Sequence, residues 1–285
     1  MPQRKLGTSY GVDEQSIAYT VPSSTMSAMT TEYSGTGDPE RSLALLWRKP
    51  PTPSRGPKPR LTVDRIVRAA VEIADVEGLD GLSMRRIAKR LGVGAMSLYT
   101  YVPSKGELLE IMLDEVIGET LHAVPADAGW RARLEAIARQ EWELIRRHPW
   151  VLQVSMVRPP LGPNTMNAYE SALAAVDGIG LSEQEMARVV NLVTDYARGA
   201  ARGAVEWTLA EQRTGVGHDE WWSARAPFLD RYVEGEFPVS GRVADAGVVY
   251  PDPEGDFEFG LQRVLDGVEL LVSSRAASDR PSSDR

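Results

Sequence analysis

Cysteine is absent from this sequence of 285 residues, and histidine occurs only three times. Without cysteine there is no disulfide, thiolate nucleophile or cysteine zinc site, and a reducing compartment is compatible with the chain. The histidines, His122, His148 and His218, are not spaced as ligands of one metal ion. The sequence also shows no clustered acid, base and nucleophile. We therefore predict a protein that is not an enzyme and that uses no cofactor and no metal.

Long hydrophobic runs are missing as well. No apolar stretch approaches the roughly 20 residues that a membrane helix needs, and the N-terminus lacks the charged-then-apolar pattern of a signal peptide. Hydrophobic residues make up 42% and charged residues 25% of the chain, the balance of an ordinary globular protein. The length suffices for one large or two modest domains. We expect a cytoplasmic protein that does not contact a membrane.

The chain as a whole also lacks positive charge, since its net charge is -8. The distribution of the charges is uneven. Residues 55–105 hold 10 Lys/Arg and 5 Asp/Glu, residues 106–285 hold 17 and 30, and residues 1–54 hold 5 of each. A basic module on an acidic body is the asymmetry expected when one part of a protein faces phosphate.

An alternating strand pattern is nowhere evident, and helical periodicity takes its place from Leu61 onward. We therefore predict an all-α fold. Glycines and capping boxes mark the ends of the helices. We expect helices from Val63 to Gly78, over 83–91 and 94–101, from Ser104, over 130–147, from Gly162 to about Gly178, from Ser182, across Trp221, Trp222, Phe228 and Leu229, and through 261–272. We expect a short capped helix after Asp38 and irregular structure over 236–254.

Residues 83–105 contain the most informative pattern in the chain. A short basic helix reaches Leu91, and a turn follows at Gly92-Val93-Gly94. A second short helix runs toward Tyr101 with small, hydroxylated and aromatic side chains. Two helices joined by a glycine turn are typical of a helix-turn-helix that reads DNA.

Composition divides the chain into four parts. Residues 1 to about 37 are rich in Ser, Thr and Gly without a period, and Pro50 to Pro57 form a proline-rich linker. We expect residues 1–54 to be a flexible N-terminal extension. The part over 60–120 contains the helix-turn-helix pattern. A larger helical part is expected over 121–275, and 276–285 is expected to form a flexible tail.

Several segments together resemble the TetR family of transcriptional regulators. The similarity begins at Arg60-Leu61-Thr62-Val63 and continues through the motif to Pro103-Ser104-Lys105-Gly106-Glu107-Leu108-Leu109. Arg147-His148-Pro149-Trp150 and the segment Arg158 to Asn164 look like the ligand-binding half of tetracycline-repressor-type members. The resemblance covers about sixty residues of the DNA-binding part strongly and the remainder more weakly.

The resemblance implies a ligand-responsive transcriptional repressor. The family is homodimeric, and each subunit carries three N-terminal helices for DNA and a larger helical domain for effector binding and dimerisation. It implies that the free protein binds a double-stranded, palindromic DNA operator and that a small hydrophobic molecule releases it. The alternatives are a TetR-like activator or global regulator without a ligand and, from another class, a helical enzyme.

We expect the DNA contacts to come from both helices of the motif and from the start of the next one. Arg85 is suited to guanine O6 and N7 or to a phosphate, and the alternative is a solvated charge. Lys105 resembles the family's phosphate-contacting lysine. The ring of Tyr99 either packs in the core or contacts DNA through its hydroxyl. The predicted set is Ser83, Met84, Arg85, Ala95, Met96, Ser97, Tyr99, Thr100, Tyr101 and Lys105, and Arg55, Lys58 and Arg60 are expected as an arm.

The effector site is predicted from aromatic, methionine and polar side chains in the second domain. The tetracycline repressor holds a magnesium ion partly through a histidine just before its Arg-Pro segment, whereas residues 154–159 contain no histidine here. That departure argues against tetracycline and against a metal. The predicted lining residues are Trp142, His148, Met156, Asn164, Tyr169, Asn191, Tyr196 and Trp207.

Overall fold

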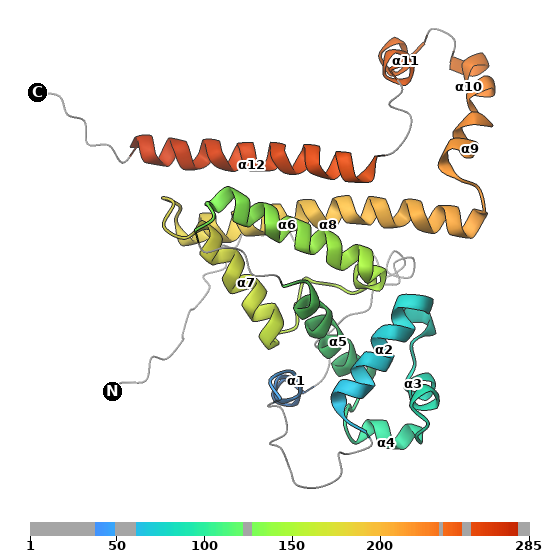
Figure 1. Cartoon of the computed structure of the whole chain (residues 1–285), viewed down its shortest axis with the longest axis vertical. Helices are drawn as coiled ribbons and strands as arrows, with labels where there is room; N and C mark the ends of the chain where they lie inside the picture. Colours follow the sequence, from blue (N-terminus) through green and yellow to red (C-terminus); the bar gives the residue numbers. More distant parts are fainter. Residues whose placement is uncertain (1–37, 49–60, 122–126, 234–235, 247–251, 279–285) are drawn as a thin grey trace, which may run out of the picture. The chain divides into compact units, whose positions relative to one another are not determined.

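A computed structural model describes residues 38–48, 61–121, 127–233, 236–246 and 252–278. In this part of the chain the regular structure is helical, which confirms the all-α prediction (Figure 1). The helices are α1 (Pro39–Leu46), α2 (Val63–Glu77), α3 (Met84–Leu91), α4 (Ala95–Tyr99), α5 (Lys105–Thr120), α6 (Trp130–Arg147), α7 (Pro163–Val176), α8 (Glu183–Thr214), α9 (His218–Ser223), α10 (Ala226–Val233), α11 (Pro238–Asp245) and α12 (Pro253–Ser278). Two short 3-10 helices are η2 (Leu79–Gly81) and η3 (Pro149–Gln153).

Helices α2, α3 and α4 form a three-helix module that contains the predicted helix-turn-helix, here called the DNA-binding module after that prediction (Figure 1). Thr62 begins α2 by accepting a hydrogen bond from the Arg65 amide over 3.2 Å. Gly92 ends α3 in the left-handed conformation, with φ of 68°, which glycine adopts without a steric penalty. The module closes around side chains that water does not reach, among them Ile66, Ile87, Leu98 and Val102.

Helix α5 connects this module to the rest of the molecule. It packs against α2 on one side and against α6 and α7 on the other. Of the capping box predicted at its start, the N-cap half is present, because the Ser104 hydroxyl accepts from the Gly106 and Glu107 amides. The Glu107 carboxylate contacts the Ser104 hydroxyl rather than its backbone amide. Leu108, Met112 and Val116 are fully buried along α5. Any movement of α5 therefore concerns both the module and the body.

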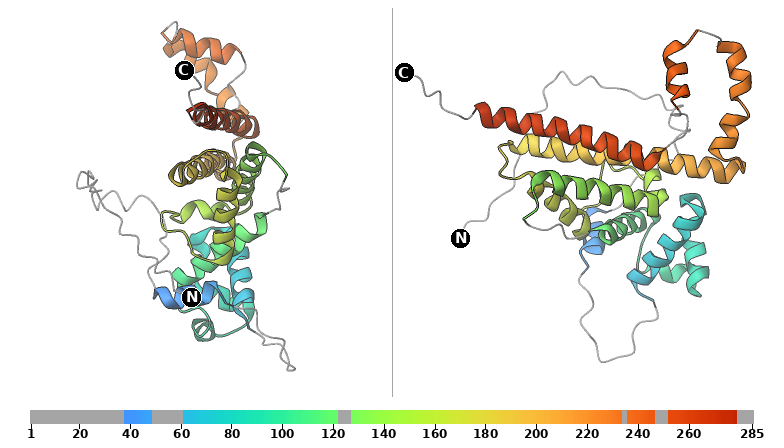
Figure 2. Two further views of the ribbon diagram at one scale, coloured as in Figure 1. Left: turned by 90° about the vertical axis from the view of Figure 1, so that its left-hand side faces the viewer. Right: turned by 45° about the horizontal axis from the view of Figure 1, so that its top comes forward.

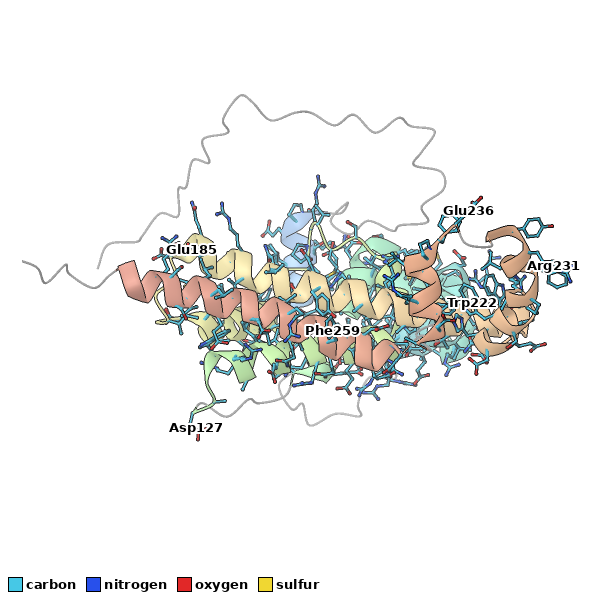
Figure 3. The ribbon with its side chains drawn as sticks, turned by 90° about the horizontal axis from the view of Figure 1, so that it is seen from above. Asp127, Glu185, Trp222, Arg231, Glu236 and Phe259 are labelled. Carbon is cyan, nitrogen blue, oxygen red and sulfur yellow. The ribbon has the colours of Figure 1, made fainter. Side chains whose placement is uncertain are left out.

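Helices α6, α8 and α12 lie side by side and form the body, as both views in Figure 2 show. The predicted capping box of Ser182 and Glu185 starts α8. Figure 3 shows α12 running along α8, and Arg275 of α12 pairs with Glu185 at the first turn of α8. The two helices are therefore antiparallel.

Two predictions about the segment after α8 are wrong. The helix expected across Trp221 to Leu229 is broken into α9 and α10, because Pro227 has no amide hydrogen and its ring clashes with a preceding carbonyl in a continuous helix. The segment 236–254 was expected to be irregular but contains α11 and the start of α12. Proline stands at the first position of both helices, where its fixed φ favours helix initiation.

Gly199 and Gly203 on α8 have open space beside them. The sequence predicts that these glycines admit a close neighbour, but nothing within the described chain lies within 4 Å of a Cβ built at either position. Among the helices that the structure describes, none is long and apolar enough to cross a membrane.

Candidate nucleic-acid interface

The two motif helices meet at a tight turn. After Gly92, the Val93 amide donates to the Ala88 carbonyl over 3.0 Å, which fixes the direction in which the chain leaves α3. Helix α4 then begins at Ala95 and buries Leu98 completely. Ala95 packs against the core as well, whereas Met96, Ser97 and Tyr99 are exposed.

The basic residues of α3 fall into two groups. Arg86 pairs with Glu77 of α2, and Arg90 pairs with Glu72 of the same helix. Arg85 and Lys89 form no hydrogen bond or ion pair with any residue that the structure describes, and both are exposed. They stand one helical turn apart, so they share a face of α3.

A hollow on this face is lined by Ser83, Arg85, Arg86 and Lys89. Ser83 is the N-cap of α3, and its hydroxyl accepts from the Arg86 amide over 3.3 Å. The first amides of a helix attract anions because they lack intrahelical partners. Cations and a helix start thus meet at one place, which suits a phosphate group.

The exposed face of α4 is apolar and hydroxylated. Met96 is 78% exposed, although a methionine on a module this small would ordinarily be buried. Ser97, Tyr99 and Thr100 are also exposed, and Tyr101 follows them. Such a surface fits thymine methyl groups and backbone oxygens.

Met84 and Ala95 are less accessible than their inclusion in the predicted set implies. The Met84 side chain is buried, so at this position α3 offers DNA only its backbone amide. Ala95 is partly buried against the core. Lys105 is the first residue of α5 and is partly exposed. The arm predicted from Arg55, Lys58 and Arg60 lies outside the described residues.

A polar junction that the sequence did not reveal links α2 to the body. The Trp150 indole donates to Asp75 Oδ1 over 2.8 Å, and His148 Nδ1 lies 2.7 Å from the same oxygen. The other ring nitrogen of His148 lies 3.3 Å from Glu119 Oε2 at the end of α5. His148 is buried, and its predicted effector role competes with this structural one.

Two of the predicted effector residues are brought together. Trp142 of α6 and Tyr196 of α8 both stack on Phe257 of α12, with ring centroids 4.5 and 6.1 Å apart, respectively. The Tyr196 hydroxyl donates to the Phe257 carbonyl over 2.9 Å. Burial, aided by the charge of Asp256, raises the pKa of this hydroxyl, so it keeps its proton for the hydrogen bond.

The remaining predicted effector residues lie on several elements. Asn164 at the start of α7 donates to the Asp114 carbonyl over 3.0 Å, so its amide is engaged inside the chain. Tyr169 and Asn191 are exposed, whereas Met156 is partly buried against the core. Trp207, on the C-terminal half of α8, meets the ring of His218 edge-on with centroids 4.0 Å apart.

A helix-turn-helix with an unpaired basic face, joined by one shared helix to a larger helical body, defines a DNA-binding regulator with a separate regulatory domain. Residues 66–112 match the family model of the bacterial regulatory proteins of the tetR family, and residues 124–272 match that of the tetracyclin repressor-like C-terminal domain. The chain belongs to the TetR family of transcriptional regulators. Regulators of this family bind DNA and small-molecule effectors and act as dimers.

Several relatives of this chain carry the word repressor in their names. The HTH-type transcriptional repressor DrrR1 of Streptomyces coeruleorubidus is 48% identical over 256 residues, which cover 89% of this chain and 94% of that protein. The class A tetracycline repressor protein from transposon 1721 of Escherichia coli is 37% identical over 79% of this chain and 99% of its own. These relatives confirm the prediction of a DNA-binding transcriptional regulator.

A solved structure supports the arrangement of both domains. ActR of Streptomyces coelicolor, a TetR family protein crystallised in complex with actinorhodin, superimposes with a TM-score of 0.59 at 30% identity. The similarity covers 74% of this chain and 96% of ActR. The predicted combination of an N-terminal helix-turn-helix domain and a larger C-terminal helical domain is thereby confirmed.

Proposed function

We propose that this protein represses transcription by binding a palindromic operator as a homodimer, and that a small hydrophobic molecule releases it. The observation that carries the proposal is that α3 leaves Arg85 and Lys89 exposed and unpaired among the described residues, while α4, which packs against α3, leaves Met96 and Ser97 exposed. A cationic helix start next to a small apolar surface suits phosphate and base edges together.

Each predicted DNA contact has a role in this proposal. Arg85 reads a base edge or a phosphate, and the Ser83 and Met84 amides hold a phosphate at the start of α3. Met96 and Ser97 enter the major groove, with Ala95 behind them. The hydroxyls of Tyr99, Thr100 and Tyr101 and the ammonium of Lys105 contact the DNA backbone. The DNA-binding domain is assigned to 60–120 and the effector and dimerisation domain to 121–275.

A homodimer is supported by apolar side chains that α8 and α12 leave exposed. Leu192 of α8 is 51% exposed, and Phe259 and Leu270 of α12 are 67% and 73% exposed. The open space beside Gly199 lets another helix approach closely. A twofold dimer presents two identical DNA-binding modules, so the operator would be palindromic.

The aromatic stack of Trp142, Tyr196 and Phe257 supports an effector site in the body. A flat hydrophobic molecule that enters between α6, α8 and α12 would contact these rings. The crystallised complex of ActR with actinorhodin makes that compound a reasonable first probe. A protein that binds chromosomal DNA belongs in the cytoplasm, and no catalytic step is part of the proposal.

The test is a DNA-binding assay with the full chain. We expect purified protein to prefer a fragment from the region beside its own gene over a scrambled duplex, with an affinity that falls steeply as salt rises. Adding actinorhodin, or hits from a thermal-shift screen of hydrophobic compounds, should release the DNA. Equal binding to both duplexes would refute the repressor. Stimulated transcription of the same fragment in vitro would favour an activator.

A further inference from the structure

Helix α1 lies before the residues that the family models match and contacts three parts of the molecule. Asp38 caps its start by accepting from the Glu40 amide over 3.0 Å. Leu46 is buried, and α1 packs along α5, the helix shared by the module and the body. The helix that the sequence predicts after Asp38 is therefore present and docked.

The residues directly after α1 reach in two directions. The Trp47 indole donates to the Leu161 carbonyl over 2.7 Å, in the loop that precedes α7 of the body. Arg48 Nη2 and Nε donate to Asp64 Oδ1 over 2.7 and 3.2 Å, at the first turn of α2. Trp47 therefore binds the body, and the next residue, Arg48, binds the DNA-binding module.

The Arg48 guanidinium has further contacts on α1 and α5, which fix its orientation toward α2. Its Nη1 donates to the Leu45 carbonyl over 3.2 Å, so the guanidinium also caps the end of α1. Its Nη2 lies 4.0 Å from a carboxylate oxygen of Glu115 on α5. A guanidinium that is fixed by three elements holds a definite geometry, which a flexible surface lysine would not.

We propose that Trp47 and Arg48 are positioning residues for DNA recognition: they fix the first turn of α2 relative to the body and thereby set the placement of α3 and α4. This inference rests on the proposed function. Helix α2 packs against α3, and the opposite end of α2 is held by Asp75 at the polar junction. Contacts at both ends of α2 therefore hold the DNA-binding module in the orientation of this structure.

The experiment measures operator affinity of the full chain by fluorescence anisotropy over a range of salt concentrations. Arg48→Ala, Asp64→Asn and Trp47→Phe should each weaken binding about two- to fivefold, the range for one exposed ion pair or one hydrogen bond. Arg48→Ala combined with Asp64→Asn should cost no more than Arg48→Ala alone, because the contact between the two side chains is already lost in that single variant. Arg41→Ala, on the exposed side of α1, is the matched control and should bind as the wild type does.

The salt dependence separates positioning from a direct phosphate contact. A positioning role leaves the slope of log affinity against log salt unchanged, whereas loss of a phosphate contact reduces it by about 0.9. Asp64→Asn gives a second separation. If Asp64 only repels DNA, its neutralisation strengthens binding, and the proposal is overturned. A reduced slope for Arg48→Ala overturns it as well.

Two checks separate a loss of positioning from a loss of folding. One is a set of milder variants, and the other is a titration that measures the fraction of each protein able to bind DNA. Trp47→Phe keeps an aromatic ring and Arg48→Lys keeps the charge, and Arg48→Lys should recover part of the lost affinity. A positioning role changes affinity while the DNA-binding fraction of the protein stays that of the wild type. If a variant instead keeps the wild-type affinity and only its DNA-binding fraction falls, the residue supports folding alone. Wild-type protein that binds no DNA refutes the proposed function, and variants that all match a binding wild type refute only this inference.

Discussion

Asp75 and Trp150 lie 75 positions apart in the sequence and share one hydrogen bond of 2.8 Å, from the indole Nε1 to Asp75 Oδ1. Asp75 belongs to α2 of the DNA-binding module, whereas Trp150 belongs to η3 of the body. His148 Nδ1 lies 2.7 Å from the same oxygen. Nearby, the Leu79 amide donates to the Gln153 side chain over 3.2 Å. The end of α2 is therefore fastened to η3 by polar contacts.

Asp75→Ala is expected to destabilise the protein by about 2 kcal/mol or more. The change leaves the buried Trp150 N–H without an acceptor, and an unmade hydrogen bond of a buried group costs about 1–3 kcal/mol. Urea unfolding monitored by tryptophan fluorescence measures the loss. Asp80→Ala, in the adjacent η2, is the control and should change stability little. Equal losses in both variants would contradict the role of Asp75.

The contacts of this junction could not be predicted from the sequence, whereas most of the helices could. Helices α2 to α8 follow from periodicity and caps, because each signal lies within a few residues of the element it defines. Asp75 carries no such signal, since its partners lie more than seventy positions away. The same holds for the stack of Trp142 on Phe257. The unpaired state of Arg85 could not be predicted either, because Arg86 has the same local sequence character and only the fold gives it Glu77 as a partner.

Arg85→Ala should reduce specificity at one base pair and cost about 1–3 kcal/mol in binding to the operator. Its guanidinium is exposed and available, whereas that of Arg86 is held by Glu77. Arg86→Ala is therefore the matched control, with a smaller loss that is alike for all sequences. Competition between operator variants and random DNA gives the measurement. Equal losses of Arg85→Ala on operator and random DNA would exclude base reading.

Lys105→Ala should weaken binding to every DNA sequence alike and lower the salt slope by about 1. Lys105 is the first residue of α5, where its ammonium adds to the positive end of the helix. Affinities at several salt concentrations supply the slope. Arg133→Ala, on α6 of the body, is the control cation. A slope equal to that of the wild type would show that Lys105 contacts no phosphate.

Glu185→Gln should remove part of the acid sensitivity of the fold. The Ser182 amide, Arg275 and the Ser182 hydroxyl lower the pKa of Glu185 from 4.5 to about 2. Because the pKa is lower in the folded state, the ionised carboxylate stabilises the protein above pH 4.5, and this contribution is lost as pH falls toward 2. The wild type should melt at a higher temperature than the variant at pH 7, and the difference should close below pH 4.5.

Glu183→Gln is the matched control for that titration, since Glu183 occupies the same first turn of α8 without a described partner. Its melting temperature should follow the wild-type curve between pH 7 and 2. A gap between wild type and Glu185→Gln that stays constant over this range would rule out the pairing of Glu185 with Arg275.

Ser42→Ala should stabilise the protein by about 1 kcal/mol. Ser42 Oγ lies on the buried face of α1 and has no hydrogen-bond partner among the described residues, and a buried unsatisfied hydroxyl is unfavourable. Alanine also has the higher helix propensity. Thermal unfolding of the two proteins provides the comparison, and a lower melting temperature for the variant would show that the hydroxyl has a partner in solution.

A buried carboxylate on α5 accepts hydrogen bonds from the first turn of α7. Asp114 of α5 accepts hydrogen bonds from the Thr165 amide over 2.8 Å and from the Thr165 hydroxyl over 2.9 Å, and its side chain is shielded from water. If α7 slid away by a fraction of a helical turn, this charge would remain buried without donors, which is costlier than either end state. A partial slide of α7 along α5 is therefore penalised, and this buried carboxylate fixes the register in which the two helices pack.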